Sequence, residues 1–292
     1  MEKIRIKKEK SIYSLCFFIP LIVIYCGLFI LPTLISFFFS MTVWNFTSFR
    51  FVGLQNFVDF FSEHSLRIGI SNTFIYAVLT CALKVILGLA LAIVLTSKIR
   101  TKNLVRSIVF FPNLISTVAV GIIFSALMHP SKGLFSKVLD AIGIHGVDLL
   151  GNRSLALYSV IMVDVWKGVG VATVIYIAGI LAISKDYYEA ASLDGTTKLQ
   201  QFAHITVPLC RPSINSVIIL AFISGMRTFD LIWSMTGGGP GFATDTMASV
   251  IYKQYAAGFY GLSTAGNVIM FVLIAVIAFP LFKYLTSKEL DA

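Results

Sequence analysis

Five ionisable residues stand inside long apolar stretches of this 292-residue sequence, and their positions are the first indication of chemistry. A charge at the centre of a bilayer costs at least ~2.5–3.5 kcal/mol on insertion scales, so such residues usually face a bundle interior or a cavity. Their ammonium, guanidinium and carboxylate groups can bind a polar solute or neutralise one another. The five are Lys84, Asp164, Lys167, Arg227 and Asp230.

Spacing leaves two interpretations of these charges open. Asp164 and Lys167 are three residues apart, as are Arg227 and Asp230, so each pair shares one face of a helix. In the first interpretation they form local ion pairs that hold helices together. In the second, two helices line a polar path, and a substrate contacts Asp164, Trp166, Lys167, Gly168, Arg227, Thr228 and Asp230.

The composition requires that membrane helices position these residues. Apolar residues make up 57% of the chain, charged residues only 13%, and the mean hydropathy is +0.87. A soluble domain carries about 25% charged residues, so this chain cannot cover a water-exposed globule. At roughly 20 residues a span, six spans leave no room for a soluble enzyme of ~150 residues.

Apolar runs of spanning length predict an all-α polytopic membrane protein with six transmembrane helices. A basic segment precedes the first run, which is about twice the length of a signal-peptide core and is therefore kept as a mature helix. A transmembrane domain over 12–286 is then flanked by an N-terminus of 1–11 and a tail of 287–292. The predicted spans are 12–41, 70–95, 106–128, 155–183, 213–235 and 263–286.

Basic residues predict the orientation. Fourteen Lys and Arg residues fall on the side that holds both termini, and six fall on the other side. By the positive-inside rule both termini are cytoplasmic, in a multi-pass protein of a bacterial cell membrane. The basic residues separate apolar runs and form no continuous stripe, which argues against nucleic-acid binding despite the net charge of +9.

Motifs for catalysis, metals and nucleotides are absent from the sequence. The four cysteines show no CxxC spacing, and no HExxH or GxSxG is present, so neither a metal site nor an enzyme is indicated. The glycine-rich run 237–241 lacks the Lys of a phosphate loop and follows a span instead of a strand. The chain is therefore predicted to bind no cofactor and to hydrolyse no ATP itself.

A polar segment, 184–212, separates the fourth and fifth predicted spans and is expected to form two short helices. Asp186 with Glu189 resembles a capping box, and Thr197 with Gln200 matches one. Gly195 is expected to end the first helix, and Pro208 to block extension of the second. Helices this short are marginal in water, so the hairpin must pack on the bilayer, on its own bundle or on a partner.

The same segment resembles a known motif. Its residues fit E-A-A-x3-G-x9-I-x-L-P, with Val207 in place of the usual Leu. This resembles the EAA coupling loop of membrane subunits of binding-protein-dependent ABC importers. The resemblance assigns ATPase coupling to Glu189, Ala190, Ala191, Gly195, Ile205 and Pro208.

Further segments resemble the sugar-importer branch of that family, which contains the maltose and glycerol-phosphate permeases. In this branch the substrate pocket lies on the fourth and fifth spans, which favours the substrate interpretation of the intramembrane charges. Charged side chains can bind hydroxyls and a Trp face can stack on a pyranose. The matching segments are VGLQNF (52–57), RSIVFFPNLIS (106–116), VWKG (165–168) and FDLIWSMTGGGPG (229–241).

The resemblance implies a permease subunit of an ATP-driven importer that moves a sugar or oligosaccharide. Implied partners are an ABC ATPase dimer holding ATP and Mg, a second and different permease chain, and an extracellular or periplasmic substrate-binding protein. The family often has amides near Arg227, so a fixed positive charge there suggests the hypothesis of an acidic sugar. Arg227, Lys167 or Lys84 would then serve as its counter-charge.

An alternative from another class is a secondary transporter or channel driven by an ion gradient. Asp164 and Asp230 support it as candidate proton or sodium ligands at membrane depth. No inverted repeat is visible in the sequence, which weakens this alternative without excluding it.

Overall fold

A computed structural model of the chain describes residues 18–45, 48–97 and 101–287, apart from the side chains of Phe49 and His64. Almost all of the regular structure in these residues is helical, which confirms the predicted all-α membrane fold in outline. The N-terminus of 1–11 lies outside the described residues, as does all but the first residue of the tail of 287–292. Four helices are long and apolar enough to cross a membrane, or six if two bent pairs each count as one span.

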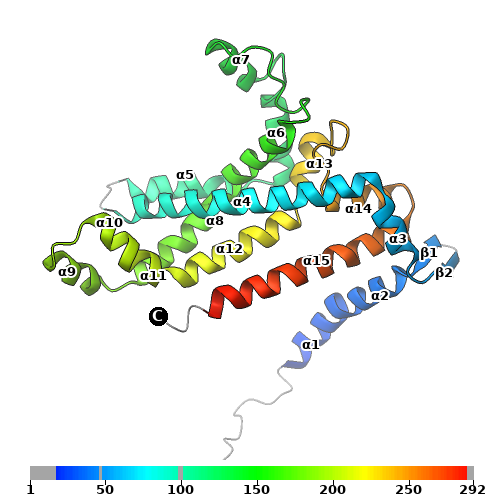
Figure 1. Cartoon of the computed structure of the whole chain (residues 1–292), viewed down its shortest axis with the longest axis horizontal. Coiled ribbons are helices and arrows are strands. Elements are labelled where there is room, and N and C mark those ends of the chain that lie inside the picture. The colour runs from blue at the N-terminus through cyan, green and yellow to red at the C-terminus, as the bar shows by residue number, and fades with distance from the viewer. Residues whose placement is uncertain (1–17, 46–47, 98–100, 288–292) are drawn as a thin grey trace, which may run out of the picture.

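The first apolar run forms one helical rod that diverges from the other helices (Figure 1). It comprises α1 (Ile19–Tyr25), a wider π turn η2 (Cys26–Ile30) and α2 (Leu31–Phe39). Prolines lie in the first turns of α1 and α2, where a missing N–H breaks no hydrogen bond that the helix needs. None of the residues in its spanning window is buried.

A small antiparallel hairpin follows the rod, with β1 (Thr42–Asn45) paired to β2 (Ser48–Phe51). The short helix α3 (Gln55–Ser62) comes next. Its buried Asn56 donates hydrogen bonds to the carbonyls of Ser40 and Thr42 at 2.9 and 2.8 Å. This amide fixes the turn through which the chain enters the bundle.

Four long helices make the bundle: α4 (His64–Thr96), α8 (Ala156–Ala182), α12 (Arg211–Met226) and α15 (Tyr260–Ser287). Helix α4 packs along both α8 and α12, and α15 packs on α12 (Figure 1). The largest buried cluster includes Tyr76 of α4 and Val160 and Ile161 of α8. These helices are apolar on nearly all sides, as expected of elements surrounded by lipid and by one another.

The third and fifth predicted spans depart from straight helices. The third consists of α5 (Lys102–Leu114) and α6 (Thr117–Leu127), which meet at 96°, and the short helix α7 (Leu134–Ala141) continues from α6. Pro112 weakens the last turn of α5, and Ser116 adopts extended backbone. The fifth bends by 68° where α12 begins, and its outer part is a separate helix, α13 (Asp230–Thr236). A further helix, α14 (Met247–Ala256), precedes α15.

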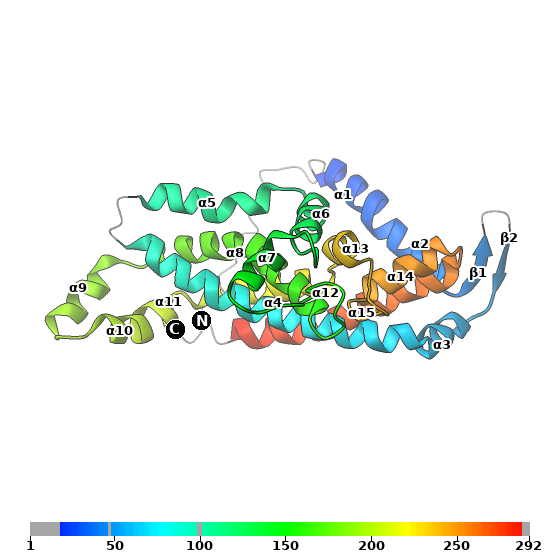
Figure 2. The ribbon, with the colours of Figure 1, turned by 90° about the horizontal axis from the view of Figure 1, so that it is seen from above.

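Most of the connections lie at two opposite ends of the molecule. At one end α4, α8 and α15 finish, and the polar segment forms α9 (Lys185–Leu193), α10 (Lys198–Gln201), a π turn η3 (Phe202–Thr206) and α11 (Val207–Leu209) (Figures 1 and 2). At the other end lie the strands, α3 and α14, while α7, between α6 and α8, protrudes apart from both ends (Figure 1). The division of these segments between two sides of a membrane, and the cytoplasmic assignment of the first end, stay predictions.

Candidate functional site

An ion pair between two helices lies at the centre of the bundle. The amine Nζ of Lys84 on α4 is 2.7 Å from the carboxylate Oδ2 of Asp164 on α8. The Lys84 side chain is 7% exposed and that of Asp164 is 22% exposed. The sequence placed Asp164 with Lys167, but here the carboxylate takes its partner from another helix, because helix packing brings Lys84 closer than the neighbour on its own helix.

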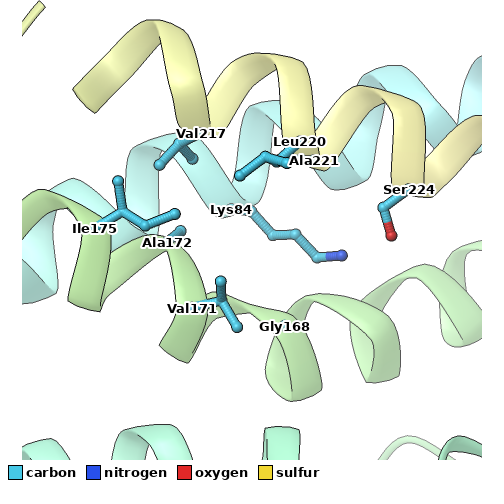
Figure 3. Close-up of a pocket in the computed structure, with 9 residues that line it drawn as sticks. All are labelled: Lys84, Gly168, Val171, Ala172, Ile175, Val217, Leu220, Ala221 and Ser224. Carbon is cyan, nitrogen blue, oxygen red and sulfur yellow. The ribbon is translucent and has the colours of Figure 1, made fainter. Parts of the chain in front are cut away.

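Lys84 reaches Asp164 because position 168 has no side chain. A Cβ on Gly168 would lie 2.7 Å from Cε of Lys84 and 2.9 Å from its Nζ, which is closer than such atoms approach. Figure 3 shows the Lys84 side chain running from α4 into the space between α8 and α12, past Gly168. Gly168 therefore leaves room for the Lys84 side chain, and a contact between its backbone and substrate stays a prediction.

The Lys84 side chain also lines a cavity of about 290 Å³ between α4, α8 and α12. The remaining walls are apolar except for the hydroxyl of Ser224, which extends into the space that the lysine enters (Figure 3). A cation in an apolar cavity interacts strongly with any anion or hydroxyl that enters, because little water screens it.

A break between α12 and α13 shapes a second cavity. Helix α12 ends at Met226, Arg227 caps it, and Phe229 adopts φ −138° and ψ −59°, which no helix continues. Arg227 lies where the negative end of the α12 dipole favours a cation. The carbonyl of Thr228 accepts a hydrogen bond from Thr246 at 3.1 Å, so side chains satisfy part of the freed backbone.

This second cavity, of about 450 Å³, brings together three of the residues predicted to contact substrate: Arg227, Thr228 and Asp230. It shares Leu220 and Ser224 with the first cavity, so the two adjoin along α12. Arg227 and Asp230 are exposed and form no ion pair with each other in the described part of the chain. Most of the polar groups that line these adjoining cavities therefore come from α4 (Lys84) and from the fifth span (Ser224, Arg227, Thr228 and Asp230), while α8 contributes Gly168 and apolar walls.

Three of the predicted residues do not line these cavities: Asp164, which is linked to the first cavity through Lys84, and Trp166 and Lys167. The ring of Trp166 packs on Phe124 of α6, with centroids 5.1 Å apart, and is 44% exposed. Lys167 is half-buried and lines neither cavity. Whether either residue contacts substrate stays a prediction, and the geometry favours Asp164, Gly168, Arg227, Thr228 and Asp230 over both.

Sequence reasoning missed two residues of the site. Ser224 lines both cavities, and its place one turn before Arg227 on α12 was the signal that could have identified it. Tyr76 of α4 is fully buried, and its hydroxyl lies beside Asp164 and Thr228 without a well-aligned hydrogen bond. No group of three His, Cys, Asp or Glu residues that could hold a metal ion occurs within the residues described.

The hairpin at one end is a second candidate site, and its helices begin and end at identifiable caps. The capping box of Thr197 and Gln200 is confirmed, with both reciprocal hydrogen bonds formed. Gly195, at φ +74°, follows α9 as predicted, because glycine adopts this left-handed conformation at little cost. The predicted box of Asp186 and Glu189 is wrong, because the cap of α9 is Ser184, which accepts from the Asp186 N–H at 3.3 Å.

Pro208 also behaves differently from the prediction. Helical structure continues past it to Leu209, and the break comes at Cys210. The π turn Phe202–Thr206 comes first, and Pro208 then falls in the first turn of a new α segment, where its lack of an N–H is tolerated. The second helix of the hairpin is thus longer than the sequence suggests.

Side-chain hydrogen bonds hold the hairpin together. The hydroxyls of Tyr188 and Thr206 are 3.0 Å apart, and the amide of Gln201 donates to Ser192 at 3.0 Å. Its tip is apolar and uncovered, because Leu193 is 90% exposed and Leu199 is 76% exposed. An ordered helical pair with an exposed apolar tip is typical of a surface that packs against a partner.

Comparisons with known proteins agree with this architecture. A family model described as "binding-protein-dependent transport system inner membrane component" matches residues 84–289. The trehalose/maltose transport system permease protein MalF of Thermococcus litoralis is 31% identical, over 93% of this chain and 92% of that protein. The multiple sugar-binding transport system permease protein MsmF of Streptococcus mutans is 30% identical, over 82% of this chain and 84% of its own length.

Among solved structures, a similar chain belongs to a bacterial ABC transporter involved in the import of the acidic polysaccharide alginate. The two chains superpose with a TM-score of 0.81, over 93% of this chain and 94% of that one. Their sequences are 22% identical, so the likeness concerns the fold.

Proposed function

This chain belongs to the family of inner membrane components of binding-protein-dependent transport systems, and from that premise we propose that it is the permease subunit of an ATP-driven sugar importer. The observation that carries the proposal is the pair of adjoining cavities on α8, α12 and α13, which hold charges at membrane depth within a family of permeases. The subunit opens and closes a path and performs no bond chemistry.

A sugar or oligosaccharide fits both the relatives and the site. The trehalose/maltose and multiple-sugar permeases cover more than four fifths of this chain at 30% identity or more. Hydroxyl-rich solutes need several hydrogen-bonding groups in an otherwise apolar cavity. Candidate contacts are ranked by their place around the cavities: Asp164, Gly168, Arg227, Thr228 and Asp230 first, then Trp166 and Lys167.

The membrane topology of this proposal keeps six spans within a transmembrane domain of 12–286, with both termini cytoplasmic in a bacterial cell membrane. The bent pair α5–α6 then crosses the membrane once, or partly re-enters it, and the fifth span begins with α12. The hairpin of α9–α11 lies on the cytoplasmic side, because basic residues are concentrated there.

Coupling to the ATPase is assigned to the hairpin 184–212. Its exposed tip at Leu193 and Leu199 offers apolar contact area, and its hydrogen-bonded helices can transmit force without unfolding. Gly195 allows the turn between the helices, and Ala residues permit close approach to a partner surface. The residues proposed for coupling are Glu189, Ala190, Ala191, Gly195, Ile205 and Pro208.

The proposed assembly contains an ABC ATPase dimer that binds ATP and Mg, an external substrate-binding protein and a second, different permease. The second permease is proposed from the resemblance to the sugar-importer branch, and the unburied face of the α1–α2 rod is free to contact it or lipid. The family description itself refers to binding-protein dependence.

An acidic sugar is the finer proposal for the substrate. Arg227 is exposed to the second cavity and Lys84 to the first, so cations face both. Replacing Arg227 with Gln keeps hydrogen-bonding capacity and removes the charge, so uptake of an acidic sugar should fall more than uptake of a neutral analogue. Equal loss for both sugars would remove the acidic substrate and leave the sugar importer standing.

Co-purification tests the assembly directly. The chain is isolated from membranes in detergent and the retained subunits are identified by mass, with an ATPase and a second polytopic chain expected. In the intact complex, Gly195→Val should uncouple ATP hydrolysis from transport, because a side chain is strained at φ +74°. Gly143→Val, at φ +86° on the other side of the membrane, is the matched control and should leave coupling intact.

The alternative of an ion-gradient-driven transporter is not favoured by the family to which the chain belongs. Its support came from Asp164 and Asp230. In the structure the Asp164 carboxylate pairs with Lys84, so a proton or sodium ion would have to compete with this lysine to bind there.

A further inference from the structure

A third cavity, of about 350 Å³, lies where α4 and α8 end and the hairpin begins. Its walls come from the last turn of α4, the end of α8, and the inner faces of α9, α10 and η3. The cavity is distinct from the apolar tip at Leu193 and Leu199, which are not among its lining residues. It therefore stays accessible when the tip contacts a partner.

The cavity has one apolar end and one basic end. Ile93, Ile180 and Leu181 line it from the membrane helices, and Leu181 is 65% exposed. Lys185 and Lys198 line it from the hairpin, with the hydroxyls of Thr96 and Ser97 nearby. This division matches an amphiphile whose charged head is anionic.

The two lysines have no competing acid in the cavity. Neither Lys185 nor Lys198 forms an ion pair with any described residue, and no Asp or Glu is among the described residues that line the cavity. The nearest acid in sequence, Asp186, accepts a hydrogen bond from Ser184 at 3.0 Å. Two unpaired ammonium groups on a shared wall attract an anion, and phosphate oxygens are strong acceptors for such donors.

We propose that this cavity binds the phosphate headgroup of an anionic phospholipid from the leaflet beside the hairpin. Spanning helices end at the level of the headgroups, so the ends of α4 and α8 place Lys185 and Lys198 where anionic lipid is available. One acyl chain lies along Ile93 and Leu181. Because Lys185 begins α9 and Lys198 begins α10, one headgroup fastens both helices of the hairpin to the membrane surface.

A free phosphate ion offers the same head chemistry, and the experiment separates the two sources. The purified complex, stripped of lipid in detergent, is titrated with dioctanoyl-phosphatidylglycerol and, separately, with inorganic phosphate. Binding is measured by native mass spectrometry. Lys185→Gln with Lys198→Gln should weaken lipid binding at least tenfold. Lys102→Gln with Lys283→Gln removes the same charge at the same end but outside the cavity, and should change the affinity less than twofold.

A second variant tests the apolar end without touching the hairpin. Leu181→Gln should weaken binding of the lipid severalfold and leave binding of inorganic phosphate unchanged, because only the lipid has an acyl chain. The Leu181→Gln variant also tests the lipid proposal if the double lysine variant fails to assemble. Because the experiment measures lipid binding, its outcome does not depend on whether the chain transports a sugar.

Three results would overturn the proposal. If the control variant weakened lipid binding as much as Lys185→Gln with Lys198→Gln, the lipid would be attracted by the overall charge of this end and not by the cavity. Phosphate binding as tight as lipid binding, with no effect of Leu181→Gln, would assign the cavity to a free ion. Retention of lipid with loss of the ATPase subunit in the Lys185 and Lys198 variant would assign the lysines to an acidic protein surface.

Discussion

Two Lys–Asp pairs occur in the described part of the chain, and they differ in how fully the carboxylate is satisfied. In the loop before α14, the fully buried Asp245 accepts from Lys253 at 2.8 and 2.7 Å, and from the hydroxyl of Ser249 at 2.7 Å. In the centre of the bundle, Asp164 has one well-formed hydrogen bond, from Lys84 at 2.7 Å. Lys84 of the second pair lines the cavity of about 290 Å³, whereas neither Asp245 nor Lys253 lines either cavity of the site.

The difference separates a structural ion pair from one that is available to a ligand. The buried Asp245 carboxylate accepts three hydrogen bonds from two groups, which fills most of its acceptor sites. The glycine-rich run closes tightly around it, with the carboxylate where a Cβ of Gly238 would be. Lys84 has two further donor positions and faces a cavity. A solute that enters can therefore interact with Lys84 without first breaking a saturated network.

Removing the charge of Asp245 gives the largest expected effect. Asp245→Asn leaves the Lys253 charge without its partner, and breaking a buried pair in this way costs about 3–5 kcal/mol. Thermal unfolding of the purified complex should show a drop in Tm, with little specific change in substrate preference. A Tm equal to that of the parent protein would show that the loop pair is not structural.

The central pair should affect transport as well as stability. Asp164→Asn is expected to lower uptake about tenfold or more, because it removes the partner that holds Lys84 beside the cavity. It should also reduce stability, since the Lys84 side chain left without its partner is only 7% exposed. The double variant Lys84→Met with Asp164→Asn measures the coupling of the two groups, and its loss of stability should be smaller than the sum of the single losses. Strict additivity would contradict the pairing.

Gly168→Ala tests the same pair without changing a charge. The added methyl group would meet Cε of Lys84 at 2.7 Å, so the lysine must move away from Asp164. Uptake should fall several-fold in a transport assay with the assembly intact. Gly27→Ala is the matched control, because nothing lies within 4 Å of its Cβ position, and it should transport normally.

The smallest expected effect is at Ser224, which lies between the two cavities. Ser224→Ala removes one hydroxyl, and a neutral hydrogen bond contributes about 0.5–1.5 kcal/mol, so the apparent affinity for substrate should weaken roughly two- to tenfold. Substrate binding to the assembled transporter measures this. Ser216→Ala, on an exposed part of the same helix, should have no effect.

The sequence predicts those parts of the fold that depend on local composition. Long apolar runs place the spans, and short-range chemistry places the cap of Thr197 and Gln200 and the turn at Gly195. Their determinants lie within a few residues of the features they produce. The family resemblance rests on the same segment, and the family assignment is confirmed.

Features that depend on long-range packing could not be predicted in this way. Lys84 and Asp164 lie 80 residues apart, and nothing local indicates that α4 brings its lysine to α8. The break between α12 and α13 occurs at Arg227–Phe229, a stretch with no proline or glycine to mark it. The local spacing therefore suggested an ion pair between Asp164 and Lys167, its nearest cation in sequence.

Asn72 fixes one point of α4. Its amide donates to the carbonyls of Ala243 and Asp245 at 3.0 and 2.9 Å, which fastens this part of the helix to the loop before α14. Lys84 lies midway between Asn72 and Thr96, the end of the helix beside the hairpin, at a rise of 1.5 Å per residue. If α4 tilts as a rigid rod about Asn72, a displacement at Thr96 moves Lys84 by roughly half as much.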